Sequence, residues 1–228
     1  MTNQHSANNE IPKHLGDLQL VDDLAEVAWL PAVSHDGPTT RSFVPRGYQR
    51  CIRVLDAIYS DTLGRDLNWE DIRPDTTNLG LIDGIEAVLS RFGDSGIAGE
   101  LVPTRLRRTT LEMLQLILDS GAPGAGGTEC WFALWSDDVM FPLPSSPMAY
   151  RLSSVRYCYI YHGYVASWRS IWPTLIPSLW WPIDRSWCIA HDVDLRWTYI
   201  AGSEELADSL LTSGLPCEEA PWDERITK

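Results

Sequence analysis

The chain has 228 residues, enough for one large domain or two small ones, and we expect one. Asp and Glu outnumber Lys and Arg by 31 to 18, and the formal charge of −13 argues against a nucleic-acid partner, because phosphate binding needs a basic surface. No apolar run approaches the roughly 20 residues that a membrane-spanning helix requires, so we expect a soluble protein with no membrane partner.

The two ends of the chain differ in composition from its middle. Residues 1–16 are polar and lack the basic and apolar regions of a secretory signal, so we expect a disordered tail in a cytoplasmic protein. Residues 215–228 are acidic and contain prolines, which predicts a second tail. This leaves residues 17–214 as a single domain.

Helical periodicity is present in several segments. Apolar residues at helical spacing, with acidic residues between them, predict an amphipathic helix over 17–30. Asn68 is placed to cap a short helix with an acidic first turn. Broader apolar stripes predict helices over 81–92 and 103–118, and a last helix is predicted over 203–211.

Segments rich in β-formers predict about five strands. They are expected near 48–55, 130–135, 156–164, 187–193 and 198–200. The last two are expected to form a hairpin, and alternation along the first places Arg50 and Arg53 on opposite faces. The predicted fold class is therefore α+β, with a largely antiparallel sheet of about five strands covered by helices.

Three tyrosines fall on one side of the strand near 156–164. Alternation separates Tyr157, Tyr159 and Tyr161 from the smaller apolar side chains between them. The smaller side is expected to face the core, which leaves the phenols on a half-exposed surface. They form either an ordinary cross-strand ladder or a stacking platform for a flat ligand.

The stretch 179–194 concentrates the most informative residues. Pro182 fixes its own φ and favours extended geometry before it, so we expect Trp180 and Trp181 on a stiff, exposed loop. Asp184 or Ser186 can bond the backbone of the turn, with Arg185 between them. Clustered Trp and Arg are typical of binding surfaces, which makes this loop a candidate recognition site.

The motif Trp-Trp-Pro-x-Asp-Arg-x-Trp, with the strings FVPRGYQRCIRVLDAIYSD, LNWEDI and ECWFALWSD, resembles a family of uncharacterised proteins from high-GC Gram-positive bacteria. The resemblance runs over roughly residues 43–212 in the same order. It implies a bacterial, cytoplasmic setting and supplies no catalytic residue. The family more often has threonine where this chain has His191, which counts against a mechanism that needs this imidazole.

The sequence offers few groups for catalysis or for metal binding. Asp192 and Asp194 share one face of a strand, as the ligands of a divalent cation must. They are weak candidates, because His191 points to the opposite face. Acid-base chemistry with His191 or His162 and one aspartate is the catalytic alternative. The five cysteines are widely spaced with no CxxC, so neither a disulfide framework nor a zinc site is indicated.

The sequence favours a non-enzymatic binding protein over an enzyme. The recognition surface would be Trp180, Trp181, Asp184 and Arg185 with the three tyrosines, and the partner either a small ligand or a basic protein such as a toxin, because the chain is acidic. The alternative is a small hydrolytic enzyme that uses Asp192 and Asp194 with His191 or His162, with or without a metal. No cofactor is expected, because no cofactor-binding motif is present.

Overall fold

The computed structural model describes residues 11–30, 39–56, 59–60, 63–73, 81–91, 127–136, 149–151, 157–171, 175–192 and 195–226. The helix predicted over 103–118 lies outside these residues, as do residues 1–10 of the predicted N-terminal tail. None of the helices in the described part of the chain is long and apolar enough to cross a membrane.

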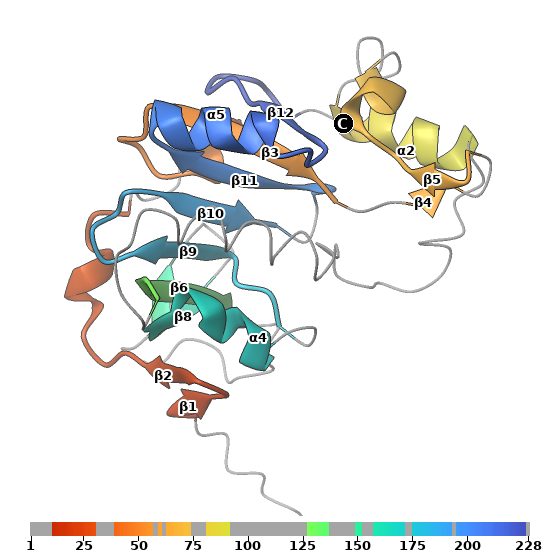
Figure 1. The fold of residues 1–228 in the computed structure, drawn as a ribbon. Helices are drawn as coiled ribbons and strands as arrows, with labels where there is room; N and C mark the ends of the chain where they lie inside the picture. Colours follow the sequence, from red (N-terminus) through yellow and green to blue (C-terminus); the bar gives the residue numbers. More distant parts are fainter. Residues whose placement is uncertain are drawn as a thin grey trace, which may run out of the picture.

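A ten-stranded sheet, antiparallel in all its pairings, dominates the structure (Figure 1). Its strands follow the order β1 (His14–Leu15), β2 (Leu18–Leu20), β8 (Tyr157–Tyr164), β6 (Glu129–Trp135), β9 (Leu179–Pro182), β10 (Cys188–His191), β11 (Trp197–Gly202), β3 (Arg50–Leu55) and β12 (Cys217–Glu219), and β7 (Ala149–Arg151) also pairs with β8. A separate pair, β4 (Tyr59–Ser60) and β5 (Arg65–Asp66), lies past the end of β3.

The predicted fold class is wrong in the size of the sheet and in the share of helix. The five expected strands are present as β3, β6, β8, β10 and β11, and β10 and β11 form the expected hairpin. The sheet has twice as many strands, because it also contains β1, β2, β9, β12 and β7, the last at a segment (150–152) whose residues allow an edge strand outside the five expected ones. Each of these has only two to four residues, too few for an alternating pattern to identify a strand.

Helices are short and few in the described residues. α2 (Leu81–Arg91) and α5 (Glu204–Thr212) confirm two predictions. Residues 69–73 are helical behind Asn68, whose Oδ1 accepts a hydrogen bond from the Asp71 N–H at 3.1 Å. Apart from these, α4 (Trp168–Ile171) is a single turn. The sheet is therefore not covered by a layer of long helices in the part that the structure describes.

The helix predicted over 17–30 is wrong. This segment forms β2 and then a 3-10 turn, η1 (Leu24–Val27). Leu18 and Leu20 are buried and alternate with the exposed Gln19, which is the pattern of a strand. Apolar residues further along the segment continue the spacing of a helix, so the helical pattern of the whole segment outweighs the short alternation at 18–20.

The central strands are buried on both faces, and two core clusters lie on the two sides of the sheet. The Trp181 face includes Ala133, Ile160, Trp181, Ala190, Trp197 and Tyr199. The Trp180 face includes Phe132, Tyr159, Tyr161, Trp180, Ile189 and Ile200. Residues from 21–30, 39–48, 67–88 and 220–226 pack on the Trp181 face. Residues from 11–20, α4 and α5 pack on the other face.

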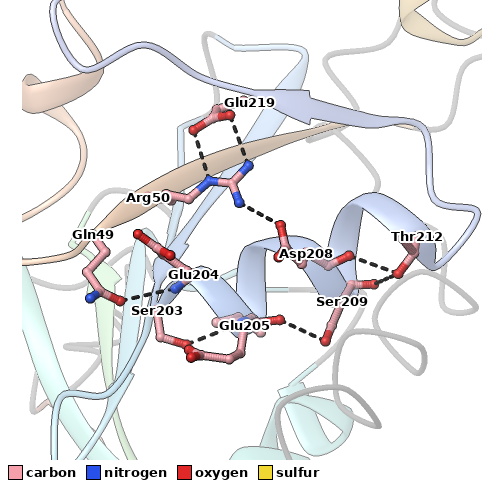
Figure 2. A network of polar contacts seen from close by, with 10 residues as sticks. Gln49, Arg50, Ser203, Glu204, Glu205, Asp208, Ser209, Thr212 and Glu219 are labelled. Carbon is pink, nitrogen blue, oxygen red and sulfur yellow. Dashed lines mark hydrogen bonds and ion pairs between the residues drawn. The ribbon is translucent and has the colours of Figure 1, made fainter.

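The C-terminal segment is held to the sheet by arginines of β3. Residues 215–226, predicted as an acidic tail, contribute β12 and bury Ile226. On the Trp180 face, the Arg50 guanidinium donates two hydrogen bonds to Glu219 of β12, at 3.0 and 2.9 Å, and one to Asp208 of α5 at 2.7 Å. Figure 2 shows this network joining the strand, the helix and the C-terminal segment.

Arg53 makes the equivalent connection on the Trp181 face, as the predicted alternation of the two arginines requires. Its guanidinium donates to Glu218 of β12 at 2.8 Å and also pairs with Glu224. The guanidinium carbon lies 4.7 Å from the centre of the Trp69 ring. The Arg53 side chain is only 8% exposed and that of Glu218 11% exposed, so this pair is far less screened by water than the Arg50 pair.

We therefore expect Arg53→Ala to lower the free energy of unfolding by about 3 kcal/mol, because it removes a largely buried cation from Glu224 and leaves Glu218 with Arg73 alone. Arg50→Ala is the matched control: it also removes two bonds to one glutamate from the same strand, but at a more exposed position, and we expect a smaller loss. Urea unfolding of both variants measures the difference. Equal losses would show that burial of the Arg53 network does not stabilise the fold.

Candidate functional site

The two adjacent tryptophans of the predicted loop are core residues. Trp180 and Trp181 belong to β9, which pairs with β6 and β10, and their exposed fractions are 4% and 0%. The Trp180 ring meets Phe132 edge-on at 5.5 Å, and the Trp181 ring meets Trp29 edge-on at 5.8 Å. The prediction of an exposed loop is wrong, because both tryptophans belong to a strand in the middle of the sheet, and the turn that Pro182 opens lies after them.

The tyrosine ladder of β8 is not a surface either. Tyr159 and Tyr161 are fully buried, and Tyr157 is half-buried. The Tyr161 hydroxyl donates a hydrogen bond to the Pro12 carbonyl at 3.0 Å, and burial raises the pKa of this phenol well above its usual value. The expected half-exposed platform is absent because the N-terminal segment packs over this face of β8.

Asp184 and Arg185 do reach the surface, in the turn that follows β9. As predicted, the Asp184 side chain bonds the turn backbone, accepting from the Ser186 N–H at 2.9 Å. Arg185 has a φ of 57°, a left-handed conformation that is uncommon for a residue with a side chain. Its guanidinium carbon lies 5.0 Å from the centre of the half-buried Trp29 ring, so cation and indole form one surface feature.

A larger surface lies at the end of β9 from which this turn leads. It consists of Glu129, Trp131, His162, Tyr164 and Ile183, and we call it the Trp131 surface. Register pairs Glu129 with Tyr164 and Trp131 with His162. The Ile183 N–H donates to the Glu129 carbonyl at 3.2 Å, so Ile183 lies on the other side of Glu129. Residues of three adjacent chain segments thus meet around one glutamate.

The Trp131 surface is partly apolar and open to solvent. Tyr164 is 46% exposed and Ile183 is 49% exposed, which makes them two of the four large hydrophobic side chains that are exposed in the described part of the chain. Trp131 and His162 are half-buried, with ring centres 4.7 Å apart. Most of the other apolar side chains of the strands are buried, so exposed apolar groups that gather at one place indicate an interaction surface.

A carboxylate lies within this aromatic surface. Oε2 of Glu129 is 3.5 Å from Nε2 of His162, and both side chains are partly exposed. Aromatic rings and a carboxylate attract cations, the first through the ring quadrupole and the second through its charge. The arrangement is therefore suited to binding a positively charged group.

Of the predicted catalytic residues that the structure describes, His162 belongs to the Trp131 surface, while His191 and Asp192 lie elsewhere. His191 and Asp192 are at the end of β10 and are 6% and 7% exposed. Nδ1 of His191 is 3.1 Å from Oγ1 of Thr198, its partner across the hairpin. His162 lies toward the other end of these strands, so the structure does not bring it to Asp192. Asp194 lies outside the described residues.

The cation site predicted at Asp192 and Asp194 lies partly outside the described residues. Within the described part of the chain, no three His, Cys, Asp or Glu side chains are grouped so that they could hold a metal ion. The cysteines are free, and burial raises the pKa of the Cys51 and Cys188 thiols well above the usual value. Both thiols are therefore held in the protonated, unreactive form.

Sequence reasoning missed one unusual carboxyl group, that of Asp56. This residue directly follows β3, is 3% exposed, and neither of its oxygens has a hydrogen-bond partner in the described structure. Burial raises the pKa of Asp56 from 3.8 to about 8. The positive charge of Arg196 lowers this pKa, but its effect is smaller than that of burial. The sequence gives no signal for this, because an acidic residue after a strand is usually exposed.

The raised pKa of Asp56 predicts a loss of stability with rising pH. The unfolded chain releases this proton near pH 4 and the folded chain only near pH 8. The contribution of protonated Asp56 to the free energy of unfolding is therefore fully present below about pH 4 and is lost as the pH rises toward 8. Relative to Asp56→Asn, which stays neutral, the wild type should lose about 1.4 kcal/mol per pH unit in this interval. Urea unfolding at several pH values measures this. A constant difference between the two proteins, as expected for the exposed control Asp22→Asn, would show that Asp56 ionises normally.

Comparison with known proteins adds no assignment to this geometry. A scan against protein-family models, a search of curated proteins and a search of solved structures each found no match. A function for the chain is therefore argued from its own residues.

Proposed function

We propose that the protein is a non-enzymatic binding protein and that it captures a basic protein partner, such as a toxin, on the Trp131 surface. The observation that carries this proposal is the exposure of Tyr164 and Ile183 on the two sides of the Glu129 backbone. A bacterial, cytoplasmic setting without nucleic-acid or membrane partners belongs to the same proposal, and rests on the motif resemblance and on the acidic charge.

Charge complementarity supports a basic partner. The chain carries a formal charge of −13. The segment that supplies Trp29 also bears four exposed acidic residues, which are Asp17, Asp22, Asp23 and Glu26. An acidic surface attracts a basic protein over several ångströms and speeds its association, while apolar contacts provide most of the affinity.

The competing function is a hydrolytic enzyme that uses His191 and Asp192. The observation in its favour is that both side chains lie at the same strand end. Their burial weighs against it, because a substrate must reach the reacting groups. The Trp131 surface needs no rearrangement to meet a partner, and we therefore place the function there.

The test replaces the two exposed apolar side chains and leaves the core intact. We expect the double variant Tyr164→Ser, Ile183→Ser to bind a peptide of four Arg-Leu repeats about tenfold more weakly than the wild type, because apolar contact area is lost. The matched control is Leu63→Ser, Leu211→Ser, which removes the other two exposed apolar side chains of the described residues. Calorimetric titration at near-physiological salt measures the affinities. Equal affinities of the two double variants would contradict the proposal.

A further inference from the structure

Glu129 has the geometry of an anchoring group within the Trp131 surface. Its side chain is 48% exposed, so it is open to a partner but already partly shielded from water. Tyr164 lies opposite it on β8, and the rings of Trp131 and His162 lie in the next row along the strands. A cation that docks here meets a carboxylate and aromatic rings at once, and removal of water strengthens both attractions.

His162 is in contact with the carboxylate that such a cation would bind. Nε2 of the imidazole lies 3.5 Å from Oε2 of the carboxylate. When the ring is protonated, this becomes an ion pair, and the imidazolium occupies the carboxylate that an incoming side chain needs. When the ring is neutral, the carboxylate keeps its full negative charge for a partner.

Building on the proposed function, we infer that Glu129 binds an arginine or lysine side chain of the basic partner, and that protonated His162 competes for the same carboxylate. Capture is then strong at slightly alkaline pH and weak at slightly acidic pH. Mild acidification can add a positive charge to a histidine side chain, so a comparison of binding at two pH values tests this competition.

Few other charged groups in the described structure face His162. On β2 its partner across the ladder is Gln19, which is neutral. On β6 its neighbours are Trp131 and Glu129, and on its own strand the next residue on the same face is Tyr164. Glu129 is thus the acidic neighbour whose charge the imidazole neutralises, and the pH dependence follows from this one pair.

The experiment measures binding of the same peptide of four Arg-Leu repeats at about pH 8 and about pH 5.5. Arginine keeps its charge at both values, so a change in affinity comes from the protein. We expect wild-type affinity to fall about threefold to fivefold on acidification, in line with the strength of a partly exposed ion pair. His162→Gln, which cannot become charged, should remove most of this fall, so the ratio of its affinities at the two pH values should be close to one.

Glu129→Gln should weaken binding about fivefold at pH 8 and should make it nearly independent of pH. The matched control is Asp22→Asn, which removes the same charge from another exposed position and reports on general attraction to an acidic protein. Chemical-shift changes of the His162 ring and the Trp131 indole N–H during the titration locate the bound peptide.

The possible outcomes separate this inference from the function on which it rests. If Tyr164→Ser, Ile183→Ser weakens binding while Glu129→Gln behaves like Asp22→Asn, the surface binds the peptide but Glu129 is not its anchor, and the inference is overturned. If His162→Gln keeps the full pH dependence, the competition is overturned. If none of these variants differs from its control, the proposed function fails as well.

Discussion

Burial of the sheet on both faces is the constraint on which the rest of the structure depends. Each central strand places apolar side chains alternately into the Trp181 core and the Trp180 core, so neither face is left for solvent or for a ligand. Large aromatic side chains fill both layers because each buries much apolar area and packs edge-on against its neighbours. Polar side chains of these strands are consequently found mostly at the strand ends and toward the β12 edge.

These polar positions divide the molecule by role. At the β12 edge, Arg50 and Arg53 fix the C-terminal segment through carboxylates on opposite faces. At one end of the strands, His191 and Asp192 are enclosed. At the other end, Glu129 and His162 stay partly open among aromatic and apolar side chains. The third group alone combines exposure, apolar contact area and charge, which is why it carries the proposed binding function.

Much of the strand pattern was predictable from the sequence. Runs such as 130–135 and 156–164 contain enough β-formers in a row to identify a strand, and the hairpin of β10 and β11 follows from the short turn between them. The short strands were not predictable in this way, because two to four residues carry no periodicity. Residues 217–219 join the sheet where their glutamates pair with arginines about 165 residues away in the sequence. No local pattern encodes such a pairing.

The candidate site was predicted only in part, for a related reason. Asp184 and Arg185 were placed at the surface because turn residues have a local signature. Trp180 and Trp181 were misplaced, because a tryptophan pair beside a proline looks the same in a buried strand as in an exposed loop. The Trp131 surface comes from the register of β6 with β8, which the sequence of neither strand contains.

Hydroxyl-radical footprinting with and without the Arg-Leu peptide can show whether the strand ends, and not the tryptophan pair, form the recognition surface. We expect Trp131 and Tyr164 to be oxidised in the free protein and protected by the peptide, while Trp180 and Trp181 stay unmodified in both states. Oxidation of Trp180 and Trp181 in the free protein, with protection on binding, would contradict this expectation.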